Sequence, residues 1–109
     1  MAVKENISDV SPKGFQALIE GKELVVADFF AEWCMPCLMM TPIIDGLAKK
    51  HTNAKFVKVN VEESPALAEK YGVSSLPCIV FIKNGKEIDR VTGSTSEAIL
   101  EAKIKEHSK

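Results

Sequence analysis

The sequence predicts a single α/β domain over residues 1–109, with a central mixed β-sheet flanked by helices on both faces. Short apolar runs of strand length alternate with stretches whose apolar residues recur at helical spacing. Helices that cross between successive strands predict parallel pairing, and Asn84-Gly85 predicts a tight hairpin that adds an antiparallel edge. No repeat, linker or low-complexity tract divides the chain further.

The first half of the chain predicts two strands and two helices. A short strand around Ile7 precedes a helix over residues 11–21, which a Ser-Pro pair opens and a glycine ends. The run 24–30 is apolar on both alternating faces, which is typical of a central strand covered by helices. A second helix is expected from Cys34 to about residue 51, with an apolar stripe along one side.

The second half predicts the remaining strands. Residues 56–61 alternate as a strand does, and a Ser-Pro pair then opens a short helix over 64–72. Residues 78–82 form another buried strand, from which the hairpin leads into a strand over 86–91. A last helix is expected to begin at Ser94, which has capping-box spacing to the glutamate three residues later.

The composition narrows the classes of function. The formal net charge is -1, so the chain has no basic excess to bind nucleic acid or an anionic membrane. Its start has no apolar stretch of the kind that forms a signal peptide, and no apolar run approaches the roughly 20 residues that span a bilayer. We therefore expect a cytoplasmic protein, in which three cysteines are catalytic, metal-binding or buried rather than structural disulfides.

The most informative motif is Trp33-Cys34-Met35-Pro36-Cys37, which follows the central strand and opens the second helix. The first turn of a helix has unpaired N–H groups and a partial positive charge, and both stabilise a thiolate. Cys34, at the very start, gains most from this position. Cys37, one turn later, is expected to be more buried and to keep its proton longer. The pair thus divides into an attacking and a resolving thiol.

Two other interpretations of the pair were weighed. A zinc site needs four ligands, and only Cys78, His51 and His107 remain to complete one. His51 lies about 21 Å beyond Cys37 along a continuous helix, so we expect no metal. Two ordinary core cysteines are the other alternative, but active sites of open α/β sheets form at such strand-to-helix junctions. Redox chemistry is the favoured interpretation.

Several further landmarks occur in order along the chain. The segment 28–37 reads Asp-Phe-Phe-Ala-Glu-Trp-Cys-Met-Pro-Cys, and Pro42 follows inside the second helix. Leu76-Pro77, Lys83-Asn84-Gly85 and Gly93 come later. In these motifs the sequence resembles the thioredoxin family: its active-site segment, helix-kinking proline, cis-proline loop and two later landmarks. The resemblance covers nearly the whole chain and implies the thioredoxin fold.

The resemblance also implies a reaction and its partners. Cys34 attacks a disulfide of a client protein, and Cys37 resolves the mixed disulfide, which leaves a Cys34–Cys37 disulfide. The partners implied are disulfide-containing client proteins and a thioredoxin reductase, flavin- or ferredoxin-linked, as electron donor. We expect a monomer with no cofactor of its own.

Two charged residues are candidates for supporting roles. Asp28 interrupts an apolar strand; if it is buried, its pKa rises and it can take the proton from Cys37, as the family's aspartate does. The alternative is an aspartate that reaches solvent at the end of the sheet. Lys58 corresponds to a family lysine near that aspartate, where it lowers the cost of ionisation. A solvated strand lysine is an equally good interpretation.

Substrate contacts are expected around Cys34. The resemblance implies a cis bond before Pro77, which presents the backbone of Leu76 to an extended client segment, whereas base rates favour a trans bond. An apolar collar around Cys34 is expected to mark the contact surface. We name this collar by its members: Trp33, Met35, Pro36, Leu76, Thr92 and Gly93.

The chain departs from the family at several positions. Met35 replaces a common glycine, which broadens apolar contact with clients, and Leu38 replaces a frequent basic residue. Phe30 stands where tryptophan is frequent, and Thr92 replaces a small apolar residue. Cys78 is expected to be a small buried residue; the alternative is a thiol that exchanges with Cys34 or Cys37, or that helps to hold a metal under stress.

Two further functions compete with that of a reductase. A disulfide oxidase or isomerase has a relatively stabilised reduced form, but the lack of a secretion signal argues against it. A redox-silent binding module of the same fold has no need of an intact cysteine pair and Asp28. Reduction of protein disulfides through Cys34 and Cys37 is the prediction.

Overall fold

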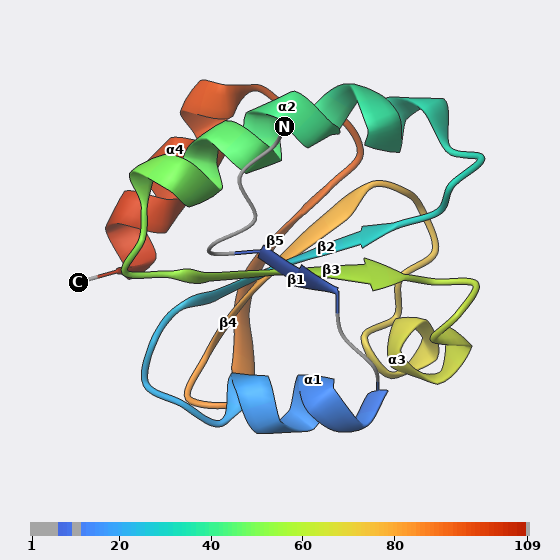
Figure 1. Ribbon diagram of the computed structural model, residues 1–109, viewed down its shortest axis with the longest axis horizontal. Coiled ribbons are helices and arrows are strands. Elements are labelled where there is room, and N and C mark those ends of the chain that lie inside the picture. The colour runs from blue at the N-terminus through green and yellow to red at the C-terminus, as the bar shows by residue number, and fades with distance from the viewer. Residues whose placement is uncertain (1–6, 10–11, 109) are drawn as a thin grey trace.

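The computed structural model describes residues 7–9 and 12–108 and contains a five-stranded mixed sheet (Figure 1). The sheet order is β1-β3-β2-β4-β5. Strands β1, β3 and β2 are parallel, and β4 and β5 are antiparallel additions. The strands are β1 (Ile7–Asp9), β2 (Val25–Phe30), β3 (Lys55–Asn60), β4 (Cys78–Lys83) and β5 (Lys86–Thr92). The predicted parallel part and antiparallel edge are confirmed.

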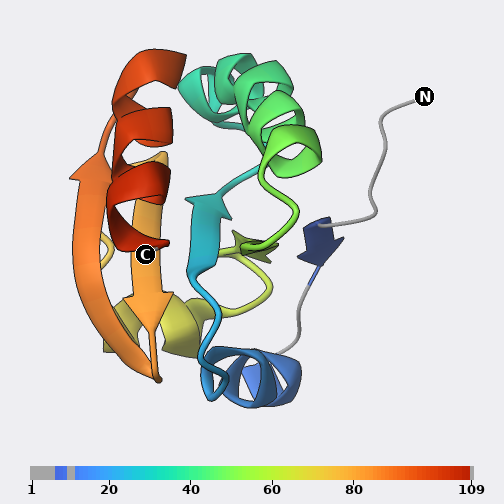
Figure 2. The same cartoon turned by 90° about the vertical axis from the view of Figure 1, so that its left-hand side faces the viewer.

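Helices cover both faces of this sheet. Figures 1 and 2 show α2 and α4 on one side and α1 and α3 on the other. The helices are α1 (Pro12–Ile19), α2 (Met35–Lys50), α3 (Pro65–Lys70) and α4 (Glu97–His107). The predicted three-layer arrangement is therefore confirmed. The proposed Ser11 cap of α1 lies outside the described residues.

Strand β2 lies in the middle of the sheet and separates two hydrophobic cores. Its Val25, Ala27 and Phe29 pack toward α1 and α3, whereas Val26 packs toward α2 and α4. Side chains of a strand alternate between the two faces, so Asp28 shares the α2 side with Val26. The Asp28 carboxylate therefore lies on a face of β2 that helices cover and where the neighbouring side chains are buried.

The connection to α4 differs from the sequence-based prediction. The helix begins at Glu97, and the hydroxyl of Ser96 accepts the Ile99 N–H at 3.2 Å, so Ser94 is not its cap. This start places Leu100 and Ile104 one turn apart, and both are buried in the core beneath α2. The capping-box spacing at Ser94 was misleading because the first-turn N–H groups of a helix need one capping side chain, and the hydroxyl of Ser96 fills that role.

The predicted hairpin is confirmed. Asn84 and Gly85 have φ values of 55° and 78°, the left-handed pair that a type I′ turn requires. The turn returns β5 alongside β4, which brings residues 92 and 93 back to the start of β4. That return matters for the site, because β4 starts directly after Pro77.

Candidate active site

The reactive segment lies where β2 passes into α2. The Cys34 N–H donates to the Ala31 carbonyl at 3.1 Å, which closes a turn directly after the strand. Cys34 is the N-cap of α2, with extended backbone angles, and its carbonyl accepts the Leu38 N–H at 3.1 Å. Pro36 occupies the second helical position, where its missing N–H costs no helical hydrogen bond. The predicted strand-to-helix junction is confirmed.

Cys34 and Cys37 are joined as a disulfide, with Cα atoms 5.3 Å apart. This separation lies within the ordinary range for disulfides. The Cys37 N–H donates to Cys34 Sγ at 3.2 Å, so a helix N–H is aimed at the sulfur expected to become anionic. An N–H in this position is of the kind that stabilises a thiolate.

The predicted difference in burial between the two cysteines is wrong for this oxidised form. Cys34 is 4% exposed and Cys37 is 5% exposed. Both residues of the disulfide are buried, so depth does not distinguish them. What distinguishes them is access: a groove reaches Cys34, and its lining does not include Cys37.

The groove beside Cys34 has a volume of ≈ 530 Å³. Trp33 and Met35 stand at it with 70% and 64% of their surface exposed, so apolar side chains are offered to solvent beside the disulfide. Exposed apolar surface of this kind marks a contact site on a small protein. The lining residues are Trp33, Cys34, Met35, Pro36, Val61, Val73, Ser74 and Leu76.

The structure brings four of the six predicted collar residues into that lining: Trp33, Met35, Pro36 and Leu76. Thr92 and Gly93 lie beside it instead. Thr92 pairs with Cys78 across β4 and β5, and the Gly93 N–H donates to the Pro77 carbonyl at 2.7 Å. The bond between Leu76 and Pro77 is cis, as the resemblance implied. Sequence reasoning missed Val61, which follows β3, and Val73 and Ser74, which lie on the same connection between α3 and β4 as Leu76.

Asp28 is buried within strand β2, with 4% of its surface exposed. Burial raises the pKa of its carboxyl from 3.8 to about 6, the nearby charge of Lys58 acts to lower that pKa, and the charge of Asp45 raises it. One carboxylate oxygen of Asp28 has no hydrogen-bond partner among the residues described. The buried, proton-binding aspartate that the sequence predicted is present.

Lys58 lies directly opposite Asp28 in the register of β2 and β3. Its ammonium group is 5.1 Å from the centre of the Phe30 ring, and the side chain is half-buried. The solvated-strand interpretation is therefore the weaker of the two. Asp45, on α2, was missed: nothing in its local sequence signals that its charge reaches a strand residue.

Comparison with known proteins identifies the family. The thioredoxin family model matches residues 6–106. A thioredoxin of Chlamydia caviae is 44% identical over 99 residues, covering 91% of this chain and 96% of the relative. A chloroplastic M-type thioredoxin of Pisum sativum is 42% identical over 108 residues, covering 97% of this chain and 62% of the relative. The chain belongs to the thioredoxin family.

Structural comparison agrees with the sequence. A crystal structure of a thioredoxin from Nicotiana alata superposes with a TM-score of 0.89 at 35% identity, covering 95% of this chain and 94% of that one. The fold is the thioredoxin fold, and the cysteine pair carries the family's thiol–disulfide oxidoreductase chemistry. The protein is a protein-disulfide reductase. Its partners are of two kinds, disulfide-containing substrates and a thioredoxin reductase.

The side chain of Trp33 is hydrogen-bonded to the connection between β3 and α3. Its indole N–H donates to a carboxylate oxygen of Glu62 at 3.0 Å, across 29 residues of sequence. The contact holds the indole against the segment between β3 and α3, which also supplies Val61 to the groove. Glu62 was missed because an exposed acidic residue after a strand carries no distinctive sequence signal.

Cys78 is free and 1% exposed. Burial is the main cause that raises the pKa of its thiol, and the nearby Thr92 hydroxyl and Arg90 act to lower it. The interpretation of Cys78 as a small buried strand residue is supported.

Among residues 7–9 and 12–108, no group of three or more His, Cys, Asp or Glu side chains is arranged to hold a metal ion. None of the helices described is long and apolar enough to cross a bilayer.

Proposed function

We propose that Cys34 is the attacking thiol of this thioredoxin. In the reduced protein, the Cys34 thiolate attacks one sulfur of a client disulfide. A Cys34–client bond forms, the client S–S bond breaks, and the other client sulfur leaves as a thiolate that takes a proton from water. The proposal rests on one observation above all: Cys34 lines the groove while its sulfur accepts the Cys37 N–H.

Cys37 then resolves the mixed disulfide. Its thiol gives its proton to the carboxylate of Asp28, and the resulting thiolate attacks Cys34 Sγ. The Cys34–Cys37 bond forms, the bond to the client breaks, and the client leaves with both sulfurs reduced. The raised pKa of Asp28, about 6, suits a group that accepts a proton near neutral pH. The positive charge of Lys58 limits how far burial raises the pKa of the Asp28 carboxyl.

Clients are recognised in the groove as extended segments. The backbone of Leu76, next to the cis-proline Pro77, pairs with the client backbone, which tolerates many sequences. Trp33, Met35 and Pro36 contact client side chains from the other wall. Thr92 and Gly93 support this surface from the end of β5, where the Gly93 N–H holds the Pro77 carbonyl.

The cycle needs two electrons and two protons to restore the dithiol. The proposed donor is a flavin- or ferredoxin-linked thioredoxin reductase, and the proposed working form is a monomer. We place this monomer in the cytoplasm, because reduction of clients requires a compartment that keeps the dithiol form populated. The chloroplastic relative marks an organelle as the competing location.

Turnover of insulin disulfides with dithiothreitol tests the assignment. Cys34→Ser is expected to abolish the acceleration, whereas Cys37→Ser keeps the first step and accumulates mixed disulfides with clients. Cys78→Ser is the matched cysteine control and is expected to keep kcat, since Cys78 is free, buried and outside the groove lining. Activity that survives in Cys34→Ser, or the absence of adducts in Cys37→Ser, refutes the assigned roles.

A further inference from the structure

One wall of the groove is a short connection between α3 and β4. Residues 72–77 supply Val73, Ser74 and Leu76 to the lining and end at the cis-proline Pro77. This wall has no regular secondary structure of its own between α3 and β4. Backbone hydrogen bonds restrain it at Val73, whose N–H donates to the Ala68 carbonyl, and at Pro77, whose carbonyl accepts the Gly93 N–H. Side-chain contacts add to these at its two ends, Tyr71 and Cys78.

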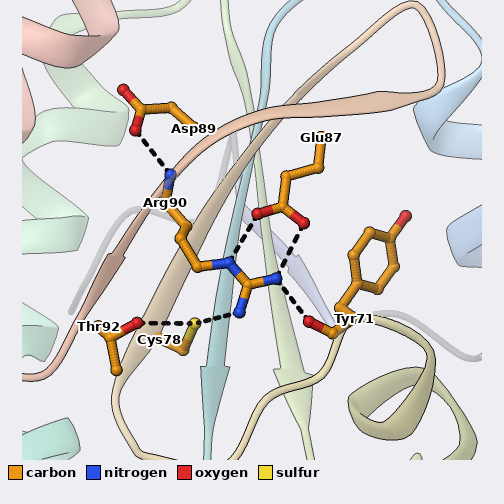
Figure 3. A network of polar contacts seen from close by, with 6 residues as sticks. All are labelled: Tyr71, Cys78, Glu87, Asp89, Arg90 and Thr92. Carbon is orange, nitrogen blue, oxygen red and sulfur yellow. Dashed lines mark hydrogen bonds and ion pairs between the residues drawn. The ribbon is translucent and has the colours of Figure 1, made fainter.

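Arg90 of β5 contacts both of those ends. Figure 3 shows its guanidinium between the Tyr71 carbonyl, to which Nη2 donates, and Cys78 Sγ, which lies 3.9 Å from Nη1. Tyr71 is the C-cap of α3, and Cys78 is the first residue of β4. One side chain thus spans the two boundaries of the wall, although it is not itself part of the groove lining.

The guanidinium is held in that place by Glu87. Arg90 Nε donates to Glu87 Oε2 at 2.6 Å, and Nη2 donates to Oε1 at 2.9 Å. Such a two-pronged contact fixes the plane of the guanidinium as well as its position, which a lysine ammonium cannot reproduce. About a third of each side chain is exposed, so the pair is partly shielded from water.

A β-bulge makes this pairing possible. Residues 87 and 90 are an odd number of positions apart, so a regular strand would point them to opposite faces. The ladder shifts between Phe81 and Ile82, however, so that Glu87 lies opposite Ile82 while Arg90 lies opposite Val80. Ile82 and Val80 both belong to the core under α1 and α3. The extra residue of the bulge therefore turns Glu87 to the same face as Arg90.

We propose that Arg90 is a positioning residue for client binding, which sets residues 72–77 at the spacing an extended client segment requires. The inference rests on the proposed function of the groove. Arg90 does not touch the reacting sulfurs; it acts through the wall, together with the Gly93 N–H that holds Pro77 from the same strand. A client that fills the groove depends on this spacing, whereas a small disulfide that meets only Cys34 does not.

The test compares Arg90→Gln, Arg90→Lys and the control Lys86→Gln. Lys86 is exposed at the start of the same strand, so its substitution removes the same charge. Each variant is assayed for KM and kcat with insulin, and for the rate at which its reduced form reacts with 5,5′-dithiobis(2-nitrobenzoate). For Arg90→Gln we expect KM for insulin to rise about tenfold with kcat and the small-disulfide rate within about twofold of the original chain. Arg90→Lys is expected to be intermediate, and Lys86→Gln unchanged.

Two outcomes overturn the proposal. One is a KM for Arg90→Gln equal to that of Lys86→Gln; the other is a parallel loss of kcat and of the small-disulfide rate, which indicates general damage to the site. If Arg90→Gln does not fold, Arg90→Lys decides by the same criteria. Failure of the proposed function is separate, because then the unsubstituted chain does not reduce insulin or Cys34→Ser still does.

Discussion

Asp28 and Lys58 face each other across the parallel ladder of β2 and β3, and the aspartate is the more deeply buried of the two. Burial disfavours the carboxylate, while the neighbouring ammonium favours it, and burial is the larger effect. The result is a carboxyl group that titrates close to neutral pH. Two predictions follow from this pair.

Asp28 makes the folded state less stable as the pH rises. Its pKa is about 6 in the folded protein against an ordinary 3.8, so the folded state binds the proton more tightly. Stability is therefore lost between about pH 4 and pH 6 and stays lost above it. Asp28→Asn is expected to raise the free energy of unfolding at pH 7 by up to about 3 kcal/mol. Urea unfolding at pH 4 to 7 measures this difference.

The difference between Asp28→Asn and the original chain is expected to close below pH 4, where the carboxyl is neutral in both states. A gain that is constant with pH indicates better packing rather than a removed charge. Asp45→Asn is the graded control: it removes the charge that raises the Asp28 pKa, so the loss of stability still begins near pH 4 but ends at a lower pH and is smaller in total.

Asp28 is also expected to control the resolving step. The decay of a preformed mixed disulfide between Cys34 and a client peptide should slow as the pH falls below about 6, because the carboxyl is then protonated. Asp28→Asn is expected to slow this decay at pH 7 by about 100-fold and to remove the break near pH 6. Lys58→Met should move the break to higher pH, since Lys58 lowers the Asp28 pKa. Rapid-quench measurement of the adduct checks all three, and an unshifted break in Lys58→Met contradicts the coupling.

Met35 is expected to contribute client affinity. It lines the groove with 64% of its surface exposed, so a bound client buries much of its side chain. Met35→Ala is expected to raise KM for insulin about fivefold, the equivalent of about 1 kcal/mol of lost apolar burial, with kcat unchanged. Leu38→Ala is the control, because Leu38 is exposed on the same helix but outside the lining. Equal effects of the two substitutions argue against a specific role for the groove.

Cys78 is expected to resist alkylation in the native protein. It is 1% exposed and the pKa of its thiol is raised, so neither access nor ionisation favours reaction. Treatment of the oxidised protein with iodoacetamide at pH 8 should label no cysteine until denaturant is added, and then one. Mass spectrometry of the labelled protein decides. Labelling of Cys78 under native conditions, or its appearance in a disulfide, restores the exchange hypothesis.

Local sequence signals predicted the features that depend on neighbouring residues. The junction at Cys34 follows from an apolar strand, a Pro in the first turn and the spacing to Cys37. The hairpin at Asn84-Gly85 follows from residues that accept positive φ. Burial of Asp28 follows from the apolar run around it. Each of these depends on a few consecutive residues, so one sequence is enough.

Features that depend on distant residues were not predicted. The contact of Trp33 with Glu62 joins positions 29 apart, and the lining of the groove draws Val61 and Val73 from separate connections. Asp45 affects Asp28 only because α2 packs over β2. The start of α4 was misplaced for a different reason, since Ser94 and Ser96 are both acceptable caps and packing of Leu100 decides between them.

Trp33 is the only tryptophan in the chain, and it stands at the mouth of the groove beside the disulfide. Indole emission from this protein therefore arises at a single place, the rim of its reactive centre. Oxidation, client docking and release of the Glu62 contact are each expected to change the surroundings of that one fluorophore. The fluorescence of Trp33 therefore offers a way to follow turnover in time without an added label.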